Sequence, residues 1–96
     1  MTDETILVRR GQAFKVALEA SPGAGYVWAL QALPAGVTLV DSGQEPPASG
    51  LLPGGSIIQV FRFQAMVRGE HAIGFVLKRA WESEVAESRT VTVKVD

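Results

Sequence analysis

The sequence predicts an all-β protein, an immunoglobulin-like antiparallel β-sandwich of about seven to eight strands. Two observations support this fold class. Apolar residues alternate with polar ones along most of the chain, and clusters of glycine and proline interrupt the alternation. Such alternation is typical of half-buried strands, and turn signals between many short strands are typical of sandwiches. No segment carries the sustained 3.6-residue apolar repeat of an amphipathic helix.

Seven segments are expected as strands, and five of them carry the alternation. They are 5–9, 12–19, 26–32, 37–41, 57–67, 72–79 and 88–95. The first and the fourth are short apolar runs. The second and the third place large apolar residues at every other position, namely Phe14, Val16, Leu18, Tyr26, Trp28 and Leu30. Because Trp28 shares the phase of its apolar neighbours, we expect its ring in the core, a familiar place for a sandwich tryptophan.

The last three strands repeat the pattern with β-branched and aromatic side chains. Their inward positions are Phe61, Phe63, Ala65, Ile73, Phe75, Leu77, Val91, Val93 and Val95. Proline and glycine at 21–23, 34–36 and 53–55, and glycine in 68–70, supply turn chemistry between strands. The stretch 42–50, which contains two consecutive prolines, is expected as a long surface loop.

The composition excludes several classes of function. The 96 residues include no cysteine and one histidine, and 9 basic side chains nearly balance 10 acidic ones. Disulfides, thiolate metal sites, cysteine nucleophiles and multi-histidine metal sites are therefore excluded. The net charge of −1 gives no positive electrostatic field that would attract nucleic acid or anionic lipid. We expect one domain over residues 1–96, a monomer with no metal, no cofactor, no nucleic-acid partner and no membrane association.

The amino-terminal residues do not resemble an export signal. They are acidic and polar, and they lack the basic start and the apolar stretch that such a signal requires. No window approaches the roughly 18 apolar residues of a membrane span. Two locations stay open, the cytoplasm, or the periplasm or cell exterior if a signal has been removed.

An alternating up-and-down path brings three connections to one end of the predicted sandwich. We name them the B–C, D–E and F–G loops, and they span 20–25, 42–56 and 80–87. The opposite end holds only tight turns. Since binding residues concentrate on loops that a rigid scaffold supports, we expect the functional site at this three-loop end.

Two single residues admit alternatives. Trp81 either folds back to cap the sandwich or stands exposed as an aromatic anchor, the residue type enriched in binding hot spots. His71 is expected as a corner residue that bonds the loop backbone. A nucleophilic triad through His71 would need a serine in an elbow-like motif, which the sequence lacks. We therefore expect no catalytic residues, and an enzyme is the least favoured of the functions considered.

Three short motifs lie on the three loops in order. They are Ser21-Pro22-Gly23-Ala24-Gly25, Leu52-Pro53-Gly54-Gly55 and Arg79-Ala80-Trp81. Together they resemble the chagasin family of cysteine-peptidase inhibitors, which carries Asn-Pro-Thr-Thr-Gly, Gly-x-Gly-Gly and Arg-Pro-Trp on these loops. The order, the intervals and the flanking strands correspond over nearly the whole chain.

The resemblance implies a reversible, competitive inhibitor whose three loops enter the active-site cleft of papain-like cysteine peptidases. All twelve motif residues are then candidate peptidase-binding residues, and the peptidase is the expected protein partner. Pro22 would restrict the B–C loop, and Gly54 and Gly55 would let the D–E backbone approach the enzyme closely. Arg79 and Trp81 would anchor on the rim of the cleft.

An alternative function is an immunoglobulin-like interaction module that has lost or changed peptidase inhibition. Five departures from the family motifs motivate it. Ser21 stands for the asparagine, Gly23 and Ala24 for the two threonines, Leu52 for a glycine and Ala80 for the proline. The threonine that Gly23 replaces is the family residue that reaches the catalytic centre.

Overall fold

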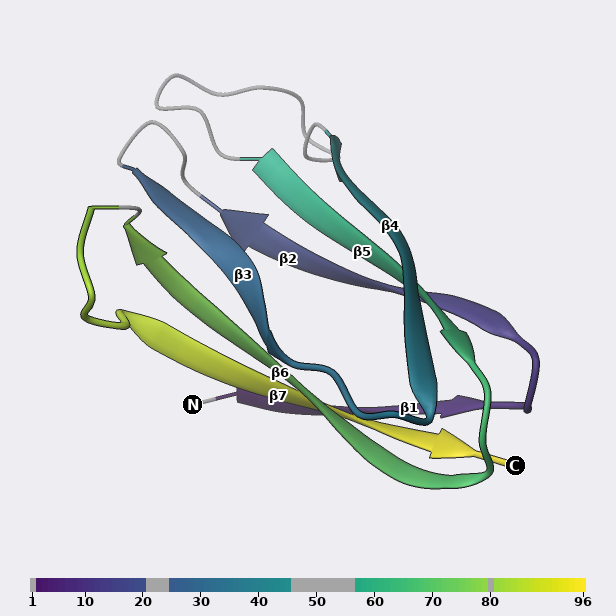
Figure 1. The fold of residues 1–96 in the computed structure, drawn as a ribbon. Coiled ribbons are helices and arrows are strands. Elements are labelled where there is room, and N and C mark those ends of the chain that lie inside the picture. The colour runs from purple at the N-terminus through teal and green to yellow at the C-terminus, as the bar shows by residue number, and fades with distance from the viewer. Residues whose placement is uncertain (1, 21–24, 46–56, 80) are drawn as a thin grey trace.

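The computed structural model describes residues 2–20, 25–45, 57–79 and 81–96 (Figure 1). Its strands are β1 (Thr2–Val8), β2 (Ala13–Ala20), β3 (Tyr26–Ala32), β4 (Val37–Glu45), β5 (Ile57–Ala65), β6 (Gly69–Arg79) and β7 (Glu87–Val95). They form two sheets, in the orders β1–β7–β6–β3 and β2–β5–β4. The predicted fold class, an all-β sandwich, is confirmed.

The core lies between the two sheets and consists largely of the alternate residues that the sequence predicts. Phe63 lies at its centre and is fully buried. Its ring centroid is 5.4 Å from that of Phe14 and 6.3 Å from that of Phe75. Trp28 is 4% exposed, as its phase predicts. Burying a large apolar side chain of this kind stabilises the fold by roughly 1.5–3 kcal/mol, so this layer joins the sheets firmly.

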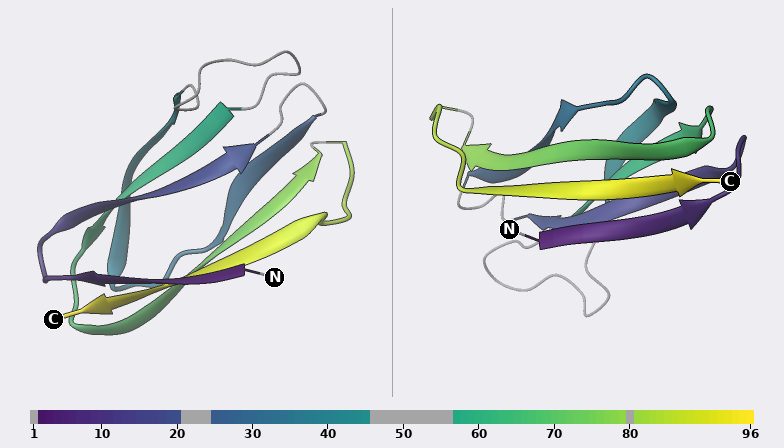
Figure 2. Two further views of the ribbon diagram at one scale, coloured as in Figure 1. Left: turned by 180° about the vertical axis from the view of Figure 1, so that it is seen from behind. Right: turned by 90° about the horizontal axis from the view of Figure 1, so that it is seen from below.

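One pairing differs from the purely antiparallel arrangement expected. β1 pairs with β7 in parallel, whereas the other pairs are antiparallel. Figure 2 shows β7 lying between β6 and β1. The chain reverses direction at each connection, so all odd-numbered strands run the same way. Two odd-numbered strands that become neighbours must therefore be parallel.

Several strand boundaries also differ from those expected, among them the start of β1, which lies at Thr2, three residues earlier than expected. β4 continues through 42–45, which the sequence analysis assigned to a loop, and these residues pair with β5. Arg62 on β5 explains part of this extension, since its guanidinium lies 3.1 Å from the Asp41 carboxylate and 3.6 Å from that of Glu45. β6 begins at Gly69, three residues earlier than expected. Because β4 extends to Glu45, the D–E loop is shorter than expected and comprises 46–56.

The end opposite the three loops is held by the corner residue that the sequence predicts. His71 Nε2 lies 2.7 Å from the backbone oxygen of Val67. The His71 ring also contacts Gly36 in the β3–β4 turn so closely that a side chain there would overlap it. The β3–β4 and β5–β6 turns are therefore joined through one imidazole, and the expected structural role of His71 is confirmed.

Candidate functional site

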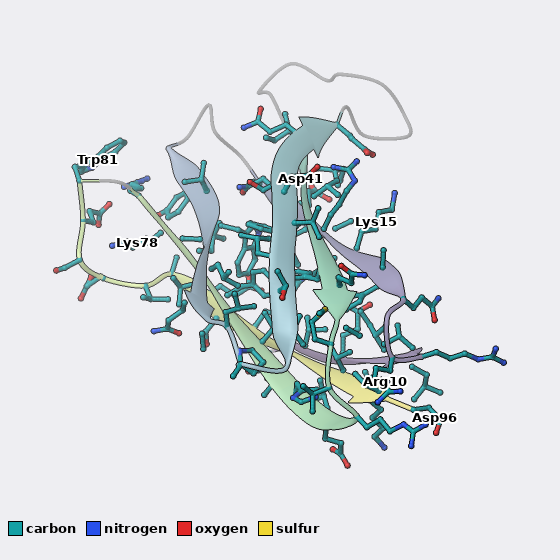
Figure 3. The ribbon with its side chains drawn as sticks, turned by 45° about the vertical axis from the view of Figure 1, so that its right-hand side comes forward. Arg10, Lys15, Asp41, Lys78, Trp81 and Asp96 are labelled. Carbon is teal, nitrogen blue, oxygen red and sulfur yellow. The ribbon has the colours of Figure 1, made fainter. Side chains whose placement is uncertain are left out.

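The strand ends that flank the B–C, D–E and F–G loops lie together (Figure 1). Tyr26 pairs with Arg79, and Ala20 pairs with Ile57, so the three loops leave neighbouring strands at one end. Trp81 marks this end in Figure 3, far from Arg10 and Asp96 at the other. Nine motif residues lie outside the described part of the chain, namely Ser21, Pro22, Gly23, Ala24, Leu52, Pro53, Gly54, Gly55 and Ala80.

The three motif residues that the structure describes, Gly25, Arg79 and Trp81, lie together. Gly25 has a φ of +88°, a conformation that favours glycine. The six-membered ring of Trp81 lies against its Cα. A Cβ built on Gly25 would be 2.5 Å from Trp81 Cη2 and 3.2 Å from both Cζ2 and Cζ3. The F–G loop therefore contacts the end of the B–C loop, because the indole of Trp81 packs directly on the backbone of Gly25.

The position of Trp81 decides between its two alternatives. The residue is 72% exposed, so it does not fold back as a cap over the sandwich core. Part of the ring contacts Gly25, and most of the remaining surface faces solvent. Exposed tryptophan of this kind supplies a large amphipathic surface for a partner.

Arg79 is held by contacts within the protein. Its guanidinium carbon lies 4.4 Å from the centroid of the Tyr26 ring and 5.9 Å from that of Trp81. Its Nη1 is 3.1 Å from Glu82 Oε1, and its backbone oxygen accepts a hydrogen bond from the Glu82 N–H. A guanidinium within about 6 Å of an aromatic centroid is attracted to the ring face. The structure thus gives Arg79 an internal role, in which it links Tyr26 to Trp81.

Gln59 is a residue of this end that the sequence analysis missed. Its Oε1 accepts a hydrogen bond from the Trp28 backbone N–H at 2.6 Å, and its Nε2 donates to the Trp28 backbone oxygen at 3.1 Å. A signal was present, because Gln59 is a polar residue in the inward phase of Phe61 and Phe63. Such a residue needs partners inside the sandwich.

The described residues offer binding surface and little reactive chemistry. They contain no group of three histidine, aspartate or glutamate side chains that could hold a metal ion. Within the same ranges, no helix is long and apolar enough to cross a membrane. Their ion pairs lie at the surface, where each contributes about 1 kcal/mol or less.

The sequence and the fold both match known proteins. Residues 8–95 match the sequence model described as chagasin family peptidase inhibitor I42. The chain belongs to the chagasin family. Members of this family are inhibitors and not enzymes, which confirms the function expected from the sequence, inhibition of papain-like cysteine peptidases.

Solved structures support the family's fold. The crystal structure of the cysteine protease inhibitor EhICP2 from Entamoeba histolytica matches with a TM-score of 0.73 and 21% identity, over 98% of this chain and 94% of that chain. The solution structure of amebosin matches with a TM-score of 0.72 and 23% identity, over 96% and 88% of the two chains. At these identities the likeness shows the fold. Comparison with curated proteins gives no significant match.

Proposed function

We propose that this protein inhibits papain-like cysteine peptidases reversibly and competitively, with the B–C, D–E and F–G loops in the active-site cleft. The observation that carries the proposal is the exposed Trp81 seated on Gly25, at the end where the three loops leave the sandwich. All twelve motif residues belong to the proposed binding surface. The inhibitor acts as a monomer and needs no cofactor, since shape and surface are sufficient for blocking a cleft.

Within this surface the described residues divide into two roles. Trp81 contacts the enzyme, and its ring is already ordered by Gly25 and Arg79 before binding. Ordering in the free protein reduces the entropy lost on association, which benefits affinity. Arg79 acts mainly through Trp81, because Tyr26 and Glu82 hold its guanidinium within the protein.

The test is an inhibition titration against papain. We expect the residual activity to fall with inhibitor concentration, the apparent inhibition constant to rise with substrate concentration, and the inhibitor mass to stay unchanged. Substitution Trp81→Ala should weaken inhibition roughly 30-fold or more, the effect of losing a central aromatic anchor. Leu7→Ala is the matched control, because Leu7 is 75% exposed but lies on β1 near the opposite end. A panel of such peptidases left fully active by a stoichiometric excess would refute the proposal.

A second candidate is the interaction module that uses the same loops for another protein. The five motif departures favour it, above all Gly23 in place of the threonine of the family motif. Chemical-shift mapping separates the two functions. The inhibitor predicts that the resonances of Gly25, Arg79 and Trp81 move when a peptidase is added, and the module predicts that they do not.

A further inference from the structure

Gln59 connects the two sheets near the loops that they carry. It is the third residue of β5, next to the end of the D–E loop, and its side chain reaches across to β3. There it bonds both backbone groups of Trp28. β3 is the last strand of its sheet, so the Gln59 amide occupies the place where a further strand would pair.

Trp28 in turn bonds a third strand, β2. Its indole Nε1 donates a 2.8 Å hydrogen bond to the backbone oxygen of Glu19, one residue before the end of β2. β2 is the last strand of the other sheet. The guanidinium carbon of Arg89, on β7, lies 5.1 Å from the centroid of the Trp28 ring. Three directional hydrogen bonds thus join β5, β3 and β2 just below the B–C loop.

We propose that Gln59 is a positioning residue for the inhibitory end, which fixes the offset between the bases of the B–C and D–E loops. The inference rests on the proposed function. Apolar packing between sheets is non-directional and permits sliding, whereas hydrogen bonds fix distance and direction. Without the Gln59 amide, β3 keeps its neighbours in the core but loses two of the three hydrogen bonds that fix its position relative to β5. The B–C and D–E loops would then no longer be held at a fixed offset, and more conformational entropy would be lost when they bind the peptidase.

The test compares Gln59→Leu with Gln64→Leu. Gln64 lies on the same strand and also bonds a backbone oxygen, that of Gly11 at 3.1 Å, but at the opposite end. Three quantities are measured for each variant: the inhibition constant against papain, the unfolding midpoint in urea, and the hydrogen-exchange rate of the Trp28 backbone N–H. We expect Gln59→Leu to raise the inhibition constant roughly tenfold and to speed exchange at Trp28. Gln64→Leu should leave both at the wild-type value.

Each outcome decides the proposal. Wild-type inhibition by a folded Gln59→Leu variant would overturn it and leave the proposed function intact. If the wild-type protein leaves papain and the rest of the peptidase panel fully active, the proposed function fails, and the amide resonances of Ala20, Gly25 and Tyr26 then test the positioning role. Displacement of these resonances in Gln59→Leu but not in Gln64→Leu supports positioning, and unchanged resonances overturn it.

A further variant covers the case in which Gln59→Leu does not fold. Gln59→Glu keeps the shape of the side chain and the acceptor for the Trp28 N–H, but it removes the donor to the Trp28 oxygen. We expect weaker inhibition than wild type, while the Trp28 N–H, which keeps its acceptor, stays protected from hydrogen exchange. Full inhibition by Gln59→Glu would overturn the role assigned to the donor.

Discussion

Substitution Gly25→Ala tests whether the seat of Trp81 matters for inhibition. The new methyl group would lie 2.5 Å from Trp81 Cη2, about 1 Å inside the range of ordinary van der Waals contact, which begins at 3.4 Å. The ring must therefore move. Because Trp81 is 72% exposed, it can turn into solvent at little cost to the folded state. The main cost to stability is the φ of +88°, which an alanine adopts at about 1–2 kcal/mol.

Gly11→Ala supplies the matched control for this prediction. Gly11 has a φ of +85°, and a Cβ built there meets nothing within 4 Å. The backbone strain is nearly equal in the two variants, so their free energies of unfolding should fall by similar amounts, about 1–2 kcal/mol. They differ only in the contact with Trp81 and in the end of the sandwich that is altered.

The assays are urea unfolding, tryptophan fluorescence and inhibition of papain. Gly25→Ala should shift the Trp81 emission to longer wavelength, make it more accessible to a soluble quencher, and weaken inhibition roughly tenfold. Gly11→Ala should change neither the emission nor the inhibition. Equal inhibition by the two variants, at equal loss of stability, would refute the idea that Gly25 orders the indole for binding.

Two further predictions concern the B–C loop and the opposite end. Gly23→Thr restores the family residue, and inhibition of papain should strengthen by about tenfold, since the variant regains a contacting side chain and loses the chain entropy of glycine. Unchanged or weaker inhibition would argue against the assigned position of this loop. His71→Ala removes the bond to Val67 and the contact with Gly36. The free energy of unfolding should fall by about 1–3 kcal/mol, with inhibition unchanged at temperatures where the variant is folded. A loss of inhibition without unfolding would contradict the separation of the two ends.

The sequence predicted the fold well where burial dictates alternation. Phe63, Trp28 and the valines of β7 lie in the core because one face of each strand must be apolar. It failed at 42–45, where the chain is polar on both sides of an edge strand. These residues are a strand because they pair with β5 and because Arg62 binds Asp41 beside them, and the local sequence pattern shows neither contact. The parallel pairing of β1 has the same origin, since neighbours in a sheet are not neighbours in sequence.

The candidate site was predicted less completely than the fold. Motifs along the chain identify residues, but they do not show which of these residues touch each other. The sequence places Gly25 and Trp81 at the same end, but it does not predict that they touch, because they belong to different loops and meet only when β3 pairs with β6. Gln59 was recognisable as a polar residue in an apolar phase, and the strand that it reaches was not. Contacts between distant segments therefore limit what could be predicted.

The contacts at the three-loop end indicate how its motif residues would contribute to the proposed binding. Of the three that the structure describes, Gly25 provides a surface for the Trp81 ring, and Arg79 faces that ring while stacking on Tyr26. Gly25 and Arg79 thus support the position of Trp81. The proposed binding surface is then smaller than its motif, and substitutions of the supporting residues should act by releasing the indole. Their effect on inhibition should consequently be less than additive with that of Trp81→Ala, because once the indole is gone there is nothing left for them to position.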